Sequence, residues 1–354
     1  MKTKLRVTLV YSSKQKAQEV QSGQGQTEPV AGEEEPPDWL AEYDGEDTID
    51  AVAAAIRQCY EVTCAEGDAE VFEFLRRTRP DFVFNISEGF GGLNRESHVP
   101  IICEMLDIPC LGSDALTVGI CLDKARAKEV MTANGIPTAA FLVADAACDP
   151  AVLTRAPLPA LVKPLREGSS MGIRNDSLVR SAAELRAKVR EVVDLYRQPA
   201  LVEEFLPGRE FTVGLLGNAP DWEILPLVEI NHAVLPAGAN PVYGYEAKWV
   251  WDDPARPLNI HICPADVPEQ LAEEIRALAL RVARVMRIRD WCRIDMRLDA
   301  AGHPKIIELN PLPGILPDPR DNSALPAAAR AAGYSYDELI MRVTQTSLQR
   351  HGLI

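Results

Sequence analysis

Two short segments near the C-terminal end of the chain restrict its fold more than any other feature. Residues 293–295 (Arg-Ile-Asp) and 308–310 (Glu-Leu-Asn) each hold two polar side chains at a spacing of two, so each pair lies on one face of an extended strand. A turn at 299–303 folds the two strands into an antiparallel hairpin. A register centred between residues 301 and 302 then sets the arginine opposite the asparagine and the aspartate opposite the glutamate.

Asp295 and Glu308 therefore stand directly opposite each other in the predicted hairpin. Like charges in this arrangement repel unless a cation lies between them, and oxygen ligands of this kind suit Mg²⁺ that holds nucleotide phosphates. The alternative is two carboxylates on a solvated face of the sheet. The strand ends in Asn310 and the unusual sequence Pro-Leu-Pro-Gly at 311–314, which favours a metal site.

A second candidate site lies in the middle third of the chain. The loop 166–172 (Arg-Glu-Gly-Ser-Ser-Met-Gly) follows a predicted strand that ends in Lys163 and Pro164. Its small residues leave backbone N–H groups free to bind an anion, and Lys163 points the same way. The loop is neither a Walker loop nor a G-x-G-x-x-G motif, so a structural turn is the alternative interpretation.

The pattern of apolar residues predicts an α/β (α+β) chain. Residues 5–11 and 81–86 are predicted strands on either side of a helix that begins at Asp47, which indicates a parallel α/β layer. A helix over 181–196 begins with Ser181 and Glu184 as a predicted capping box. The other expected elements are strands 160–163, 200–205, 210–216, 223–230, 291–298 and 305–309, and helices 100–106, 117–134, 269–286 and 336–349.

A polar insert at 18–46 interrupts this pattern. It contains three consecutive glutamates followed by two prolines, a composition that is too acidic and proline-rich for a core. We expect it to form an exposed, solvated loop.

Composition limits the partners of the chain. In 354 residues there are 52 acidic and 37 basic side chains, a net charge of −15, which disfavours a nucleic-acid surface and favours a small-molecule partner. The longest apolar runs fall short of the roughly 18–20 residues that would span a membrane. The eight cysteines lack metal or disulfide spacing, and we read them as reduced thiols of a cytoplasmic protein. The five histidines share no ligand spacing.

A series of motifs between Asp81 and Arg350 resembles the D-alanine:D-alanine ligases of the ATP-grasp fold. They occur in ligase-like order and at ligase-like intervals: 122–124 (Leu-Asp-Lys), 162–164, 166–172, 202–204 (Val-Glu-Glu), 208–213, 245–248 (Tyr-Glu-Ala-Lys), 293–295 and 308–310. The resemblance implies an N-terminal parallel α/β domain (1–120), a small central ATP-grasp domain (121–208) and a C-terminal antiparallel-sheet domain with the metal site (209–354). It also implies a homodimer.

The resemblance further implies roles for individual residues. For ATP these are Lys124 and Lys163 at the phosphates, Glu203 and Glu204 by the adenine edge, Glu210 on the ribose, Glu167, Ser169 and Ser170 in the loop, and Lys248 at the γ-phosphate. Asp295, Glu308 and Asn310 would hold two Mg²⁺ ions, for which Mn²⁺ could substitute. Arg293 and the backbone of Gly314 would stabilise the charge that develops during amide formation, with Ser170 and Lys248 also in the catalytic set.

Several departures from the family pattern fall in the predicted substrate pockets. The first strand runs into residues 11–14 (Tyr-Ser-Ser-Lys) without the glutamate that grips the ammonium of the first amino acid, and Glu88 replaces a family histidine. Trp249 replaces a tyrosine, and an insertion at 318–321 precedes Ser323, which matches the residue that holds the carboxylate of the second substrate. We expect Glu88 to take over the ammonium and D-alanine to be a poor substrate. The alternative is that Glu88 is a carboxylate at a helix terminus or on the surface, in which case substrate choice would not depend on it.

The sequence therefore predicts an ATP-dependent carboxylate–amine ligase that forms an amide through an acyl phosphate. One alternative is a ligase that joins other amino acids or carboxylic acids for a specialised metabolite. The other is a nucleotide-binding protein without turnover, which the presence of Arg293 and the metal ligands disfavours.

Overall fold

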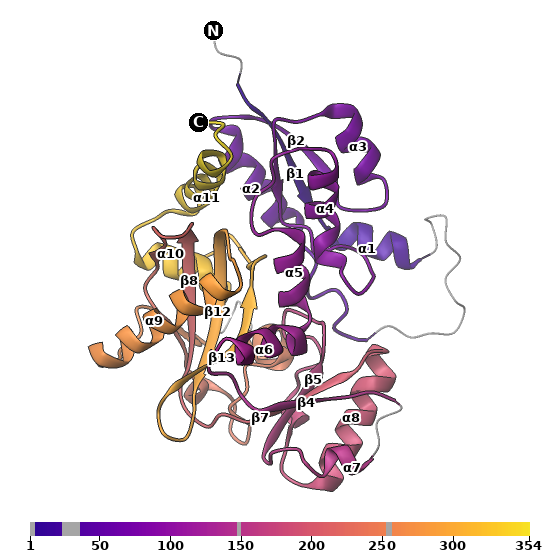
Figure 1. Ribbon diagram of the computed structural model, residues 1–354, viewed down its shortest axis with the longest axis vertical. Helices are drawn as coiled ribbons and strands as arrows, with labels where there is room; N and C mark the ends of the chain where they lie inside the picture. The colour runs from indigo at the N-terminus through magenta and orange to yellow at the C-terminus, as the bar shows by residue number, and fades with distance from the viewer. Residues whose placement is uncertain (1–3, 23–35, 147–149, 253–256) are drawn as a thin grey trace.

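The computed structural model describes residues 4–22, 36–146, 150–252 and 257–354, in which three β-sheets define three units (Figure 1). The N-terminal unit is a parallel sheet in the order β2-β1-β3. Its strands are β1 (Arg6–Tyr11), β2 (Glu61–Glu66) and β3 (Phe82–Asn85), and its helices are α1 (Lys14–Gln21), α2 (Glu46–Arg57), α3 (Val71–Thr78) and α4 (His98–Met105).

Alternation along β1 explains why helices cover both faces of this sheet. Leu9 packs in a core with Val52 and Ile56 of α2, whereas its neighbour Val10 packs with Leu75 of α3 and Val99 of α4. Successive strand residues point to opposite faces, so an apolar run of this kind needs a helical layer on each side.

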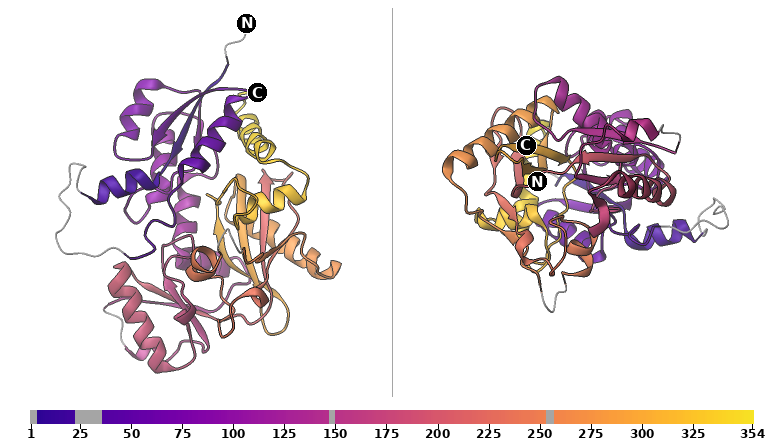
Figure 2. Two further views of the ribbon diagram at one scale, coloured as in Figure 1. Left: turned by 180° about the vertical axis from the view of Figure 1, so that it is seen from behind. Right: turned by 90° about the horizontal axis from the view of Figure 1, so that it is seen from below.

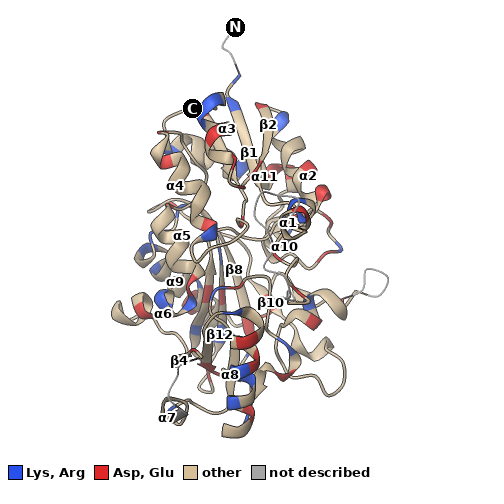
Figure 3. Ribbon diagram, turned by 90° about the vertical axis from the view of Figure 1, so that its right-hand side faces the viewer, with Lys and Arg blue, Asp and Glu red and all other residues tan. Residues whose placement is uncertain are grey.

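The central unit is a four-stranded antiparallel sheet in the order β4-β7-β5-β6. Its strands are β4 (Phe141–Ala144), β5 (Ala160–Pro164), β6 (Leu178–Val179) and β7 (Ala200–Glu204), and its helices are α7 (Pro150–Leu153) and α8 (Ala182–Tyr196). Leu185, Val189 and Val192 recur at helical spacing and pack α8 onto the sheet. Positions of both charges lie along α8 (Figure 3).

The C-terminal unit is a six-stranded sheet in the order β11-β10-β8-β12-β13, with β9 paired to β8. Its strands are β8 (Glu210–Gly217), β9 (Glu223–Ile224), β10 (Val228–Ile230), β11 (His261–Ile262), β12 (Asp290–Leu298) and β13 (Pro304–Asn310). Helix α9 (Glu269–Val285) covers one face, together with α5 (Ala115–Leu122) and α6 (Lys124–Ala133). Helices α10 (Ala324–Ala331) and α11 (Tyr336–Arg350) cover the other.

Helix α11 joins the two ends of the chain. It lies beside α2, and its residues Leu339 and Val343 share one apolar core with Ile49 and Val52 of that helix (Figure 2). The N-terminal and C-terminal units therefore share one apolar core, although their sheets are formed by different parts of the sequence.

Most expected elements are confirmed, and two are wrong. The helix expected over 117–134 is two helices, because Asp123 leaves the helical conformation with ψ 96° and caps α6 by accepting the N–H of Arg126. The strand expected over 223–230 is divided into β9 and β10 around Pro226, which cannot donate to a ladder.

Smaller differences concern caps and short elements. Ser181 caps α8, but Glu184 accepts the N–H of Arg180, so the reciprocal capping box does not form. The elements α1, β2, α3, β4, α7, β6, β11 and α10 were not predicted from the sequence. Each of the three sheets falls within one predicted domain range; the boundaries themselves stay predictions. In the described part of the chain, no helix is both long enough and apolar enough to cross a membrane.

A buried ion pair anchors α11. Arg350 donates to the fully buried Asp290 at 2.7 and 2.8 Å, and Asp290 also accepts the N–H of Gly112 at 2.8 Å. We predict that Arg350→Ala lowers the free energy of unfolding by about 3–5 kcal/mol, because it leaves a buried carboxylate without its cation. Equilibrium urea unfolding measures this loss.

The matched control is Arg342→Ala on the same helix. Arg342 pairs with Glu223 at 3.2 Å but is 44% exposed, so its removal should change the free energy of unfolding by less than about 1 kcal/mol. Equal effects of the two substitutions would contradict a special role for the buried pair.

Candidate active site

A cavity of about 380 Å³ lies between the three units and receives side chains from all of them. Glu88 comes from the N-terminal unit, Lys163 and Glu203 from the central unit, and Arg293 and Glu308 from the C-terminal unit. A site built this way exists only when the three units are in place together.

The hairpin β12–β13 has the predicted register over the site. Arg293 pairs with Asn310 and Asp295 with Glu308, and a bulge then shifts the pairing by one residue from Met296 onwards. The bulge lies beyond the functional residues, so the prediction of opposed carboxylates is confirmed.

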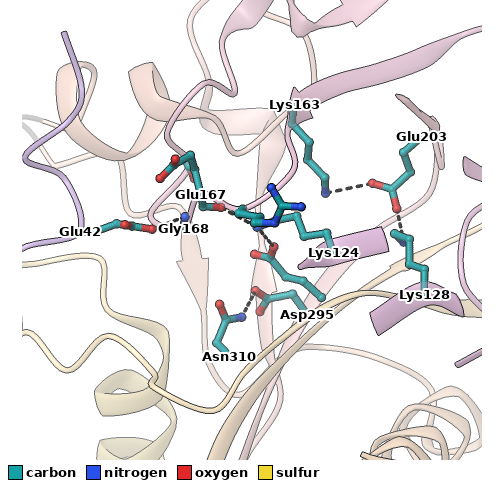
Figure 4. Close-up of polar contacts among 12 residues, drawn as sticks. Glu42, Lys124, Lys128, Lys163, Glu167, Gly168, Glu203, Asp295 and Asn310 are labelled. Carbon is teal, nitrogen blue, oxygen red and sulfur yellow. Dashed lines mark hydrogen bonds and ion pairs between the residues drawn. The ribbon is translucent and has the colours of Figure 1, made fainter. Parts of the chain in front are cut away.

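Asp295 is held by three partners. Thr212 donates its hydroxyl at 2.7 Å, Asn310 its amide at 3.1 Å, and Arg293 its guanidinium at 2.9 Å (Figure 4). Burial raises the pKa of Asp295. Burial alone would also raise the pKa of Glu308, but the positive charges of Lys124 and Lys163 outweigh it and the pKa falls to about 2.

Two lysines predicted to contact phosphates lie at this site. The ammonium of Lys124, at the start of α6, donates to the carbonyl oxygen of Glu167 at 2.5 Å and lies 3.6 Å from a carboxylate oxygen of Glu308. Lys163 on β5 pairs with Glu203 at 3.0 Å, and a third lysine, Lys128, pairs with the other oxygen of Glu203.

The trio of Lys128, Lys163 and Glu203 is buried. The two ammonium groups outweigh the burial of Glu203 and lower its pKa, whereas burial lowers the pKa of Lys128. One carboxylate between two cations leaves a net positive charge at this end of the cavity, which suits an anionic ligand.

The loop 166–172 is held against the segment that carries Lys248. Ser169 and Ser170 adopt left-handed conformations with φ of 46° and 63°. The hydroxyl of Ser170 donates to the carbonyl oxygen of Tyr243 at 3.0 Å, and the indole of Trp249 donates to the carbonyl oxygen of Ser169 at 3.2 Å. The contact closes one side of the cavity.

Lys248 lies on a short π-helical segment, Glu246–Val250, and its ammonium is 5.0 Å from the centre of the Trp249 ring. Burial lowers the pKa of Lys248 to about 8, and the positive charge of Arg293 contributes to the shift. An anion that binds beside Lys248 would therefore stabilise the charged form of this side chain.

Three predicted ATP-binding glutamates line the cavity with protein partners of their own. Glu210 accepts from Arg297 and lies beside His232, both at 3.0 Å. Glu204 lies 3.7 Å from Lys305. Gln198 donates to the carboxylate of Glu167, and Arg95 lies 3.2 Å from it. These contacts fix the position of the loop 166–172.

The expected exposed loop at 18–46 is only partly confirmed. Residues 18–21 are largely exposed, as expected, but belong to α1, whereas 23–35 lie outside the described residues and the prediction is wrong for 36–44. Segment 36–44, which we call the strap, packs on the loop 166–172. Asp38 is 2% exposed and accepts the N–H of Gly172 at 2.9 Å, and Glu42 accepts the N–H of Gly168.

All three predicted substrate residues, Glu88, Trp249 and Ser323, line the cavity. Ser323 is 6% exposed, and its hydroxyl donates to the carbonyl oxygen of Gly314 at 3.1 Å while accepting the N–H of Leu316. This hydroxyl therefore holds the loop that carries Gly314. A side chain on Gly314 would meet no atom within 4 Å, so its backbone faces open space in the cavity.

Several site residues were missed from the sequence. Lys128 lies one turn after Lys124 on α6, and this spacing could have signalled it. Thr212 shares a strand with Glu210 at a spacing of two, which is a similar signal. Glu42 and Arg95 had no such signal, because only the folded chain brings them to the loop.

The chain is similar in sequence to D-alanine:D-alanine ligases. The family described as D-ala D-ala ligase C-terminus matches residues 130–345. A D-alanine:D-alanine ligase of Nitrosococcus oceani is 30% identical over 296 residues, which are 83% of this chain and 86% of that one. An uncharacterised protein of Sinorhizobium fredii is 35% identical over 311 residues, 85% and 88% of the two chains.

Solved structures give the same fold. The crystal structure of D-alanine:D-alanine ligase from Bacillus anthracis complexed with ATP matches with a TM-score of 0.69 at 21% identity, and the match covers 99% of both chains. A second structure of the Bacillus anthracis enzyme matches with a TM-score of 0.70 at 23% identity.

The hydrogen bond from the Gly172 N–H to Asp38 should hold the loop 166–172 against the strap. Asp38→Ala removes the acceptor of the Gly172 N–H, a bond to a charged group, so hydrogen exchange at that amide should accelerate about tenfold or more. Tyr196 donates its hydroxyl to Asp38 at 2.7 Å, and Tyr196→Phe is the control because it leaves the bond between Asp38 and Gly172 intact. Slow exchange at Gly172 in both variants would mean that the strap does not hold the loop.

Proposed function

The chain belongs to the D-alanine:D-alanine ligase family, and on that premise we propose that it joins a carboxylic acid to an amine at the expense of ATP. The observation that carries the proposal is the convergence on one cavity of opposed carboxylates, Asp295 and Glu308, with the phosphate-directed lysines Lys124 and Lys163. One end of this site suits a nucleoside triphosphate, and the rest leaves room for small substrates.

The proposed reaction has two steps. An oxygen of the substrate carboxylate attacks the γ-phosphorus of ATP, and the bond to ADP breaks, which gives an acyl phosphate and ADP. The amine nitrogen then attacks the acyl carbon, the amine loses a proton, and inorganic phosphate leaves with the electron pair of the broken carbon–oxygen bond. Phosphorylation is needed because an amine cannot displace oxide from a carboxylate.

The chain supplies charge and position for these steps. Lys124, Lys163 and Lys248 offset the phosphate charges. Arg293 and the backbone N–H of Gly314 are the proposed donors to the oxygen that becomes negative when the amine attacks. Contacts of Ser170 with Tyr243 and of Trp249 with Ser169 hold the covering segments together and keep water out.

The residues at the hairpin fit a divalent cation. Asp295, Glu308 and Asn310 present hard oxygen atoms, and the low pKa of Glu308 keeps it ionised. The set has only two carboxylates, which suits Mg²⁺ because this ion commonly takes its remaining ligands from water and substrate phosphates. Bound Mg²⁺ would neutralise phosphate charge and align the phosphates. The ion itself, its number and Mn²⁺ as a substitute remain part of the proposal.

The family glutamate that is missing after the first strand has a candidate substitute in the strap. Glu42 lines the cavity, where it pairs with Arg95 at 2.6 Å. We include Glu42 in the pocket of the amine-bearing substrate, which revises the expectation that Glu88 acts there alone. Homodimer formation and a cytoplasmic location stay predictions.

The proposal is tested by removing one carboxylate at a time. Asp295→Ala and Glu308→Ala should each lower turnover about 100-fold or more, because a lost metal ligand costs several kcal/mol in the transition state. ADP release is measured with pairs of D- and L-amino acids and small carboxylic acids at saturating Mg²⁺.

Asp299→Asn is the control, since Asp299 lies on the turn of the same hairpin and outside the cavity. It should keep near wild-type turnover. Either alanine variant with more than about a tenth of wild-type turnover would refute the assignment of the hairpin.

The pKa of Lys248 gives a further prediction. Below a pKa of about 8 this side chain is charged and can pair with a phosphate, and above it the charge is lost. We expect kcat/KM for ATP to be constant below about pH 7.5 and to fall toward tenfold per pH unit well above 8. In Lys248→Arg the decline should disappear up to about pH 9.5, because a guanidinium stays protonated. An unchanged decline in that variant would assign the titration to another group.

A further inference from the structure

Several acidic side chains lie around Arg95 at the end of the cavity that the N-terminal unit lines, and Arg95 pairs with only two of them. Its guanidinium contacts Glu42 at 2.6 Å and Glu167 at 3.2 Å, and donates to the carbonyl oxygen of Arg166 at 2.9 Å. Arg95 is itself 10% exposed, so it is a fixed part of the wall. Its charge is shared by the two carboxylates that it touches.

Two more carboxylates line the same end of the cavity without such a partner. The carboxylates of Glu88 and Glu96 make no hydrogen bond or ion pair with any residue in the described part of the chain. Glu96 is only 9% exposed and lines the cavity. A buried carboxylate without a partner is costly, and a fold keeps one mainly where a ligand pairs with it.

The electrostatics agree with a site for a cation. Burial raises the pKa of Glu96 to about 7, and burial together with the neighbouring charge of Glu96 raises the pKa of Glu88. Four carboxylates thus share the guanidinium of Arg95 and the more distant ammonium of Lys124, and the excess negative charge lies where a ligand can enter. A positively charged ligand would relieve the repulsion between them.

An ammonium group is the cation that fits the proposed function, which already requires an amine-bearing acid in this cavity. An ammonium group needs only hydrogen-bond acceptors, which two carboxylates supply.

Resting on the proposed ligase function, we propose that the carboxylate substrate is a diamino acid, whose second ammonium group is bound by Glu88 and Glu96. Glu42 already has Arg95 and the N–H of Gly168 as partners, so Glu88 and Glu96 are the carboxylates left for the substrate, and one ammonium offsets the charge of only one of them. The positive charge of Lys124, which lies 3.6 Å from Glu308, reaches Glu96. Because Lys124 is a proposed phosphate ligand, the test starts with the shortest diamino acid.

Three nearly isosteric acids test the proposal: alanine, serine and 2,3-diaminopropionate, each as D and L forms. They differ only in hydrogen, hydroxyl or ammonium on one carbon. With wild type, kcat/KM for ADP release should be at least about tenfold higher for 2,3-diaminopropionate than for serine, which corresponds to a charge-assisted bond. The longer 2,4-diaminobutyrate and ornithine locate the best chain length.

Glu88→Gln and Glu96→Gln keep the shape of each side chain and remove its charge. In each variant the ratio of kcat/KM for the preferred diamino acid to that for serine should fall at least about fivefold, whereas Glu104→Gln should preserve it. Glu104 is an exposed carboxylate on α4 that lies outside the cavity. Calorimetric binding of the same acids in the presence of ADP and Mg²⁺ gives a second readout that does not need turnover.

The outcomes separate the two proposals. ADP release with alanine or serine at least as efficient as with every diamino acid would overturn the diamino-acid inference and leave the ligase function intact. A preference for diamino acids that both Gln variants retain would overturn the assignment to Glu88 and Glu96. No ADP release with any acid would refute the ligase function, and the calorimetric preference would still decide the inference.

Discussion

Two carboxylates, Asp295 and Glu308, lie opposite each other in the cavity, and the rest of the structure depends on the charges that stabilise this pair. Repulsion between them is offset by cations that come from separate parts of the chain: Arg293 on the same strand, Lys124 on α6 and Lys163 on β5. The central unit thus supplies a charge that the C-terminal unit needs, so the site and the arrangement of these two units stabilise each other. The low pKa of Glu308 is a direct result.

Charge is distributed unevenly along the cavity. The end formed by Lys128, Lys163 and Glu203 has an excess of positive charge, whereas the end near Arg95 has an excess of negative charge. An anionic phosphate chain and a cationic amine would each be stabilised at a different end. The electrostatics thereby orient a reaction between a phosphate donor and an amine-bearing acid before any substrate contact is made.

The strap and helix α11 show how distant parts of the sequence complete the fold. Asp38 and Glu42 occupy backbone N–H groups of the loop 166–172, which would otherwise be free to move. Helix α11 brings the end of the chain back to α2 through a shared apolar core, and the ion pair of Arg350 with Asp290 fixes its last turn. The loop thus receives an acidic support that its own neighbours in sequence do not provide.

The sequence by itself determined the hairpin, its register at the site and many of the strands and helices, because these follow from local periodicity and from turns between neighbours. It also indicated most nucleotide-directed residues, since these lie in contiguous motifs. It could not place Glu42, Arg95 or the buried Glu96, and it assigned the strap to solvent because an acidic, proline-rich segment has no apolar face. Only the tertiary structure decided that these charges meet at one end of the cavity, since ion pairs between residues 53 or 72 positions apart depend on packing and leave no periodic trace in the chain.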